Sequence, residues 1–146
     1  MCGIAGWLEP DPRAPVERAT IERMLATLVH RGPDGEGVFT APGIGLGTRR
    51  LAIVDVEHGA QPLANEDGSV VVVCNGEIYD APETRARLTA AGHVLRTRSD
   101  VEVIPHLYEE HGLDFLRHLR GMFALALWDA RRRRLVLARD RFAMKP

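Results

Sequence analysis

Residues 69–80, SVVVVCNGEIYD, hold the clearest structural signal in this chain. Four valines and Cys74 form an apolar, β-rich run, which predicts a strand. Asn75-Gly76 marks the predicted end of that strand, where a side-chain amide and an accessible backbone N–H arrive together. The same dipeptide is the commonest signal of a two-residue hairpin turn. The residues that follow, EIYD and a capped helix, do not resemble a returning strand, so we interpret the pair as a strand end that carries hydrogen-bond donors.

On both sides of this strand the hydrophobic periodicity alternates between strand and helix. β-rich segments separated by turns predict further strands at residues 3–8, 37–40, 43–55, 122–129 and 135–140. Further helices are predicted at residues 80–92, 99–112 and 113–121, the second with a kink at Pro105. A first helix is predicted within residues 16–32 and closed by Gly32, with one apolar face made of Ile21, Met24, Leu25, Leu28 and Val29.

The composition is that of an ordinary globular domain. The chain has 146 residues, of which 45% are apolar and 27% charged, enough for one domain with a core and too few for two. The formal net charge of −1 gives no reason to expect a nucleic-acid or membrane partner. The first residues lack the basic and apolar stretches of a signal peptide, and the apolar runs are too short to cross a bilayer. We therefore expect a cytoplasmic location.

The histidines and the arginine run predict no separate site. The six histidines, at positions 30, 58, 93, 106, 111 and 118, show no clustered ligand spacing, so we expect no metal site. The arginines at residues 131–134 lie between two predicted strands and have no aromatic residues among them. We interpret this run as a solvated hairpin turn and not as a nucleic-acid contact.

Cys2 is the residue whose chemistry stands out. Chain ends are commonly frayed, and a cysteine at position 2 taken alone is most simply chance. If Met1 is removed, however, Cys2 carries a thiol and a free α-amino group on one residue. An α-amine has a reference pKa of about 7.7–8.0, so part of it is unprotonated near neutral pH and can take the thiol proton. This is the arrangement of an N-terminal nucleophile.

A series of short motifs extends this interpretation along the whole chain. They are, in order, MCGIAG, HRGPDG, RLAIVD, GAQPL, CNGEIYD, SDVEVI and RDRFAMKP. In this order they resemble the glutaminase domain of class II glutamine amidotransferases, and HRGPDG with NGEIYD and the closing motif is similar to the glutamine-hydrolysing asparagine synthetases. The resemblance implies an α+β, Ntn-hydrolase-like fold, which is a four-layer αββα sandwich of two antiparallel sheets between helices.

The resemblance also implies a reaction. Cys2 would attack the side-chain amide of glutamine with its own amine as the base, and ammonia would leave. Water would then resolve the γ-glutamyl thioester to glutamate, while Asn75 and Gly76 would form the oxyanion hole. Two alternatives remain open: a degenerate, non-catalytic amidotransferase-like module, and an Ntn hydrolase that acts on another amide.

The substrate site implied by the resemblance fits a free amino acid. Arg50 would hold the substrate carboxylate, while Glu77 and Asp100 would contact its amino end, and these opposite charges match the two ends of such a molecule. This pairing argues against another amide as substrate. The implied substrate-binding residues are Arg50, Leu51, Ile53, Val54, Asn75, Gly76, Glu77 and Asp100.

Members of the family continue beyond the motif at which this sequence stops, with more glutaminase strands and an ATP-dependent synthetase domain. The resemblance therefore implies that residues 1–146 are a truncated glutaminase domain, with its C-terminal part and the synthetase domain absent. ATP and Mg would bind only in that synthetase domain, so no cofactor is expected in this chain. The expected partners are glutamine as substrate and the synthetase domain in cis, which would use the ammonia to make asparagine, and a homodimer of the full-length protein is left open. Ala143 stands where the family motif usually has glycine, which puts the backbone of that turn in question.

Overall fold

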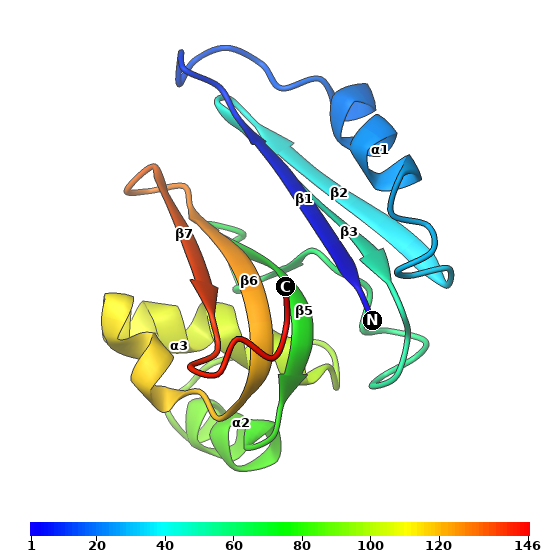
Figure 1. Cartoon of the computed structure of the whole chain (residues 1–146). Helices are drawn as coiled ribbons and strands as arrows, with labels where there is room; N and C mark the ends of the chain where they lie inside the picture. The colour runs from blue at the N-terminus through cyan, green and yellow to red at the C-terminus, as the bar shows by residue number, and fades with distance from the viewer.

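The computed structural model describes residues 1–146 and contains two antiparallel sheets packed face to face (Figure 1). The first sheet has the strand order β1-β3-β2, with β1 at Gly3–Leu8, β2 at Gly35–Ala41 and β3 at Ile44–Arg50. The second sheet has the order β4-β5-β6-β7, with its strands at Leu63–Ala64, Val70–Ile78, Gly121–Asp129 and Arg134–Arg139.

Helices cover the outer face of each sheet (Figure 1). Helix α1 (Arg18–Ala26) packs on the first sheet, and α2 (Ala81–Ala90) and α3 (Val103–His111) pack on the second. Two 3-10 helices, η1 (Asp100–Glu102) and η2 (Gly112–His118), flank α3. The predicted four-layer αββα architecture is confirmed. None of the helices is both long enough and apolar enough to span a membrane.

Strand β5 separates two apolar layers. Val72 and Cys74 face the helices and join the largest core cluster, which includes apolar residues of α3. Val73 faces the other way and packs with Ile44 and Leu46 of β3. This alternation is that of a strand buried on both faces. Asn75 has the same parity as Val73, so its side chain is directed between the two sheets.

The prediction that this strand ends at Asn75-Gly76 is wrong, because β5 continues to Ile78. Gly76 pairs with Phe123 of β6, and a Cβ built at position 76 would lie 2.6 Å from the Cα of Phe123. The missing side chain therefore lets the two strands approach each other closely. The dipeptide reflects packing within a strand and not the end of one.

Two other elements end earlier than the sequence predicts. Helix α1 ends at Ala26, and residues 27–31 form turns, so Val29 is exposed and does not extend the apolar face. Strand β3 ends at Arg50, and residues 51–55 leave the sheet. Pro105 lies in the first turn of α3, where its missing N–H removes no intrahelical bond, so α3 is uninterrupted.

The turns at the two ends of β7 bear on two points raised by the sequence. Residues 131–133 of the arginine run form an exposed turn between β6 and β7, as predicted, while Arg134 begins β7. Beyond β7, Ala143 has a φ of 56°, which is the left-handed region that glycine adopts most readily. The turn therefore keeps a glycine-like backbone despite the alanine, and the side chain of Arg139 donates to the carbonyl oxygen of Ala143 at 2.9 Å.

Candidate active site

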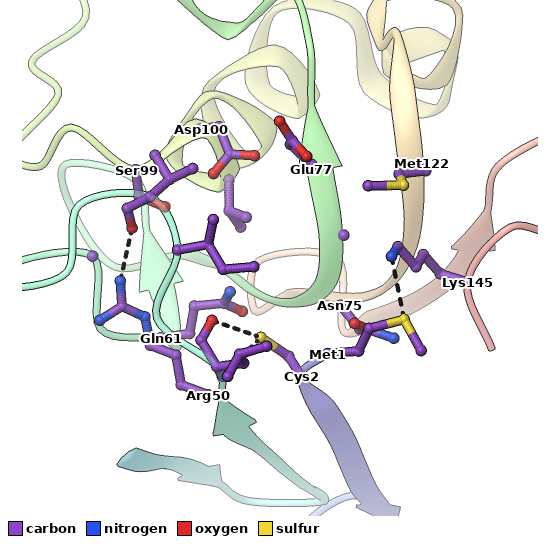
Figure 2. A pocket seen from close by; sticks show the side chains of 16 residues that line it. Met1, Cys2, Arg50, Gln61, Asn75, Glu77, Ser99, Asp100, Met122 and Lys145 are labelled. Atoms are coloured by element: carbon purple, nitrogen blue, oxygen red, sulfur yellow. Dashed lines mark hydrogen bonds between the residues drawn. The ribbon is translucent and has the colours of Figure 1, made fainter. Parts of the chain in front are cut away.

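A pocket opens where the start of β1, the end of β3 and the C-terminal half of β5 meet (Figure 2). Its volume is about 580 Å³, including the part open to solvent. The structure brings all the residues predicted for catalysis or substrate binding to this one pocket, although they come from distant parts of the sequence. These residues are Cys2, Arg50, Leu51, Ile53, Val54, Asn75, Gly76, Glu77 and Asp100.

Cys2 is held at the edge of the pocket by the segment that follows β3. Its Sγ accepts a hydrogen bond from the backbone N–H of Leu51 at 3.3 Å. Its carbonyl oxygen accepts from Nη2 of Arg31 at 3.3 Å. The side chain is half-buried, so the sulfur is fixed in place and still reached from the pocket.

Two hydrogen-bond donors of β5 point into the pocket without protein partners. On the edge of β5 that faces away from β6, the Cys74 N–H donates to Oε1 of Gln61 at 2.6 Å, and the Ile78 N–H donates to Asp100 at 2.7 Å. Because backbone groups alternate along an antiparallel strand, the Gly76 N–H lies on this edge between the two bonded positions. Asn75 is buried, and its side-chain amide lines the pocket with no hydrogen bond to another protein group. The two groups are suited to a developing oxyanion.

Arg50 has a structural contact that the sequence did not predict. Its Nη1 donates to the carbonyl oxygen of Val56 at 2.9 Å, and its Nη2 donates to those of Val54 and Asp55 at 2.8 and 2.7 Å. The guanidinium therefore orders the loop that forms one wall of the pocket. An arginine has five N–H donors, so Arg50 keeps donors for a further acceptor.

The acidic side of the pocket is built by the start of η1. Oδ2 of Asp100 accepts the Ile78 N–H, which leaves the second carboxylate oxygen for the pocket. Burial raises the pKa of Asp100 above its ordinary value, backbone N–H bonds oppose this, and the nearby charge of Glu77 adds to it. Asp100 is held in place because Arg85 donates to the carbonyl oxygen of Ser99 at 2.7 Å. A substrate ammonium would relieve the unfavourable burial of this carboxylate.

The second cysteine is unsuited to be a nucleophile. Cys74 is fully buried in the largest core cluster, on the helix side of β5. Burial raises the pKa of its thiol far above the usual range, with the charges of Asp100 and Cys2 adding to the effect. The thiolate form is therefore inaccessible at Cys74.

The pocket also contains residues for which the sequence suggested no role. The most informative is Gln61, whose buried amide donates to and accepts from the backbone of Cys74 and so continues the sheet edge beyond β4. Gln61 lies in the motif GAQPL, and its position beside Pro62 is the only feature of the sequence that distinguishes it from other polar residues. The other unpredicted lining residues are Met1, Gly59, Ser99, Val101, Met122 and Lys145.

Comparison with known proteins assigns this chain to a family. The family model of a glutamine amidotransferase domain matches residues 1–146. The glutamine-hydrolysing asparagine synthetase 2 of Bacillus subtilis is 44% identical over 148 residues, covering 100% of this chain and 20% of the relative. The glutamine-hydrolysing asparagine synthetase of Asparagus officinalis is 46% identical over 146 residues, covering 100% of this chain and 24% of the relative. The chain thus spans about a fifth to a quarter of the length of these relatives.

A solved structure agrees with this assignment at the level of the fold. The glutamine phosphoribosylpyrophosphate amidotransferase of Bacillus subtilis matches with a TM-score of 0.69 at 19% identity, covering 96% of this chain and 37% of that one. The likeness concerns the arrangement of sheets and helices described above. The family match and the identity along its full length show that this chain belongs to the class II glutamine amidotransferase domains.

Proposed function

We propose that this domain hydrolyses the side-chain amide of glutamine to glutamate and ammonia through a thioester at Cys2. The observation that carries the proposal is the convergence in one pocket of the Cys2 thiol and two unpartnered donors, the Asn75 amide and the Gly76 N–H. Arg50 and Asp100 line the same pocket, and their opposite charges suit the carboxylate and the ammonium of a free amino acid.

The proposed chemistry needs no group beyond these residues and water. The free α-amine of Cys2 takes the thiol proton, and the sulfur attacks the amide carbon of glutamine. Asn75 and Gly76 donate hydrogen bonds to the oxyanion of the tetrahedral intermediate. The amine returns the proton to the leaving nitrogen, ammonia departs, and a γ-glutamyl thioester remains. Water, deprotonated by the same amine, attacks the thioester, releases glutamate and restores the thiol.

We propose further that the ammonia is used by a synthetase domain of the same polypeptide, with asparagine as the product. This rests on the relatives, which are named as glutamine-hydrolysing asparagine synthetases and are several times longer than this chain. ATP and Mg belong to the chemistry of that synthetase domain. The residues of the pocket described here serve only the release of ammonia.

The direct test is to incubate the chain, with Met1 removed, with glutamine and to measure glutamate. We expect turnover with glutamine and much less with asparagine or with a glutamine residue inside a peptide, because neither offers the same spacing of carboxylate, ammonium and amide. No glutamate above that of a Cys2→Ala chain would favour a non-catalytic module. Faster cleavage of the peptide would favour a different Ntn hydrolase.

Asn75→Ala is expected to lower the turnover number for glutamine by a factor on the order of 10²–10³, the usual cost of removing one oxyanion donor. The KM for glutamine should change little, because the donor acts on charge that develops in the transition state. Steady-state kinetics check this result. A large rise in KM with unchanged turnover would instead make Asn75 a ground-state binding residue.

Arg50→Ala is expected to raise the KM for glutamine by roughly ten- to a hundredfold, because one charge-assisted contact is worth roughly 1.5–3 kcal/mol. Arg50→Lys should recover only part of the loss, since a point charge cannot replace a planar fork. Arg49→Ala is the matched control: Nη1 of Arg49 pairs with Glu36 at 3.0 Å and lies outside the pocket. A raised KM in Arg49→Ala and a normal KM in Arg50→Ala would overturn the assignment.

A further inference from the structure

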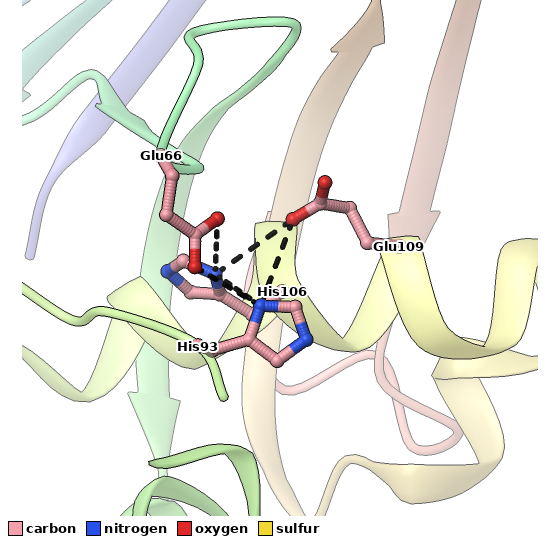
Figure 3. Close-up of side chains that lie close together, drawn as sticks. All are labelled: Glu66, His93, His106 and Glu109. Atoms are coloured by element: carbon pink, nitrogen blue, oxygen red, sulfur yellow. Dashed lines mark hydrogen bonds and ion pairs between the residues drawn. The ribbon is translucent and has the colours of Figure 1, made fainter. Parts of the chain in front are cut away.

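A second group of polar side chains gathers on the helix side of the second sheet (Figure 3). Glu66 comes from the β4–β5 turn, His93 from the segment after α2, and His106 and Glu109 from α3. We call these four residues the helix-side cluster. None of them lines the pocket, so the proposed hydrolysis of glutamine does not account for them.

The two histidines and Glu66 are spaced like the ligands of one metal ion, and Glu109 lies farther from them, with the four ligand atoms all within 4.8 Å of one another. Nδ1 of His93 and Nδ1 of His106 are 3.2 Å apart. Oε1 of Glu66 is 3.1 Å from the first and Oε2 of Glu66 is 3.3 Å from the second. Oε2 of Glu109 is 3.9 and 3.8 Å from the same two nitrogens. Metal–ligand bonds of about 2.0–2.1 Å in a tetrahedron place ligand atoms about 3.3 Å apart.

The lone pairs of these groups face one another. Nε2 of His93 is 3.0 Å from Oε1 of Glu110, which can only accept, so this nitrogen carries the proton of the neutral ring. Nδ1 of His93 is then a bare acceptor, and it faces a carboxylate and a second imidazole nitrogen. In this neutral form the centre of the cluster lacks a positive charge, which either a proton on Nδ1 of His93 or a bound metal ion would supply. The bond from His93 to Glu110 is also the contact that a metal-bound histidine usually makes with its other nitrogen.

His106 directs all its polar contacts into the helix-side cluster. The residue is 1% exposed, and its Nε2 is buried without any hydrogen-bond partner. Nδ1, which faces Glu66 and His93, is the only ring nitrogen of His106 with a polar neighbour. A buried imidazole that faces one point with one nitrogen has the geometry of a metal ligand.

The charge of the surroundings favours a divalent cation. With neutral histidines, Glu66 and Glu109 supply two negative charges, and Glu110 adds a third beside His93. The nearest arginine contact is with the backbone, where Arg96 donates to the carbonyl oxygen of Glu66 at 2.9 Å. The carboxylates of the helix-side cluster are therefore left without a basic partner other than the two histidines.

We propose that the helix-side cluster binds one divalent transition-metal ion of the Zn²⁺ class. Two imidazole nitrogens and two carboxylates are a donor set that Zn²⁺ accepts, and four protein ligands leave no open position for substrate, so the site is structural. The ion ties the β4–β5 turn, the segment after α2 and helix α3 together. It acts at a distance from Cys2 and takes no part in the hydrolysis of glutamine.

The test is a titration of chelator-treated protein with Zn²⁺, followed by calorimetry, and with Co²⁺, followed by its visible absorption. We expect one equivalent to bind and Co²⁺ to show the bands of tetrahedral coordination. At a hundredfold excess of Zn²⁺ over Kd, Tm should rise by roughly 5–10 °C and return on addition of a chelator. The same titration of a Cys2→Ser chain separates this site from any binding at the Cys2 thiol.

Matched variants locate the ion. His93→Gln and Glu109→Gln change partly exposed residues and should weaken Zn²⁺ binding by at least roughly tenfold. His111→Gln, on the same helix but outside the cluster, should bind as the unaltered chain does. Absence of a stoichiometric site in the Cys2→Ser chain would overturn the proposal. Equal binding by all three variants would overturn it as well.

Discussion

Cys2→Ala is expected to abolish the hydrolysis of glutamine while leaving the fold intact. The sulfur is the only accessible thiol, and without it no thioester forms. The side chain is half-buried at the edge of the pocket and belongs to none of the core clusters, so its removal costs little packing. Glutamate release should fall to the rate without protein, and the thermal unfolding midpoint should stay close to that of the unaltered chain.

Cys74→Ala is the matched control for this experiment. Cys74 lies in the core, where truncation lowers stability, but its thiol does not reach the pocket. Most of the glutaminase activity should remain at a temperature at which the variant is folded. Loss of activity in Cys74→Ala with retention in Cys2→Ala would show that the nucleophile has been misassigned.

A chain that keeps a residue in front of Cys2 is expected to be inactive. In that chain the nitrogen of Cys2 is an amide, which has no basicity, so the proposed base is missing. Met1 also lines the pocket, with its sulfur 3.3 Å from Nζ of Lys145, and would occupy space near the nucleophile. Two preparations, one with Met1 retained and one with it removed, should differ by the whole of the activity.

Intact-mass measurement reports the state of each preparation, and glutamate release gives its activity. Activity should follow the fraction of chains that begin with Cys2. Full activity in a preparation that quantitatively keeps Met1 would exclude the α-amine as base. A side chain of the pocket would then have to take the thiol proton.

The resemblance to a family predicted the layers of this fold, and periodicity predicted its elements better than their boundaries. Periodicity located β5, β6 and the three α-helices, because apolar spacing records which face is buried. The further helix predicted at residues 113–121 is the 3-10 helix η2 at Gly112–His118, and Gly121 already begins β6.

The dipeptide Asn75-Gly76 does not end the strand, because Gly76 is needed for the close approach of β6. Local sequence does not show which strand lies next to Gly76. The contact of Arg50 with three loop carbonyls was not predicted for a different reason: residues 43–55 were predicted to be one strand, whereas the chain leaves the sheet after Arg50 and its loop returns to the guanidinium.

The two sites differ in how far sequence could predict them. The pocket residues were found because ordered motifs resemble a family, and their placement in one pocket agrees with that interpretation. The helix-side cluster was missed, and the sequence had suggested no metal site. Its residues at positions 66, 93, 106 and 109 come from separate segments, and only His106 and Glu109 share a helix face. Spacing along the chain carries no signal of such a cluster.

The walls of the pocket are held together by contacts between distant parts of the chain, and this affects how the protein folds. Cys2 meets Leu51, which is 49 positions away, and Met1 meets Lys145, which is 144 positions away. Contacts of such separation require the closure of long loops, which slows their formation. Because Cys2 meets Asn75 and Gly76 only through such contacts, we expect the pocket to assemble late in folding. A partly folded chain would then hold the thiol of Cys2 away from these two residues, and we expect glutaminase activity to report the completion of folding.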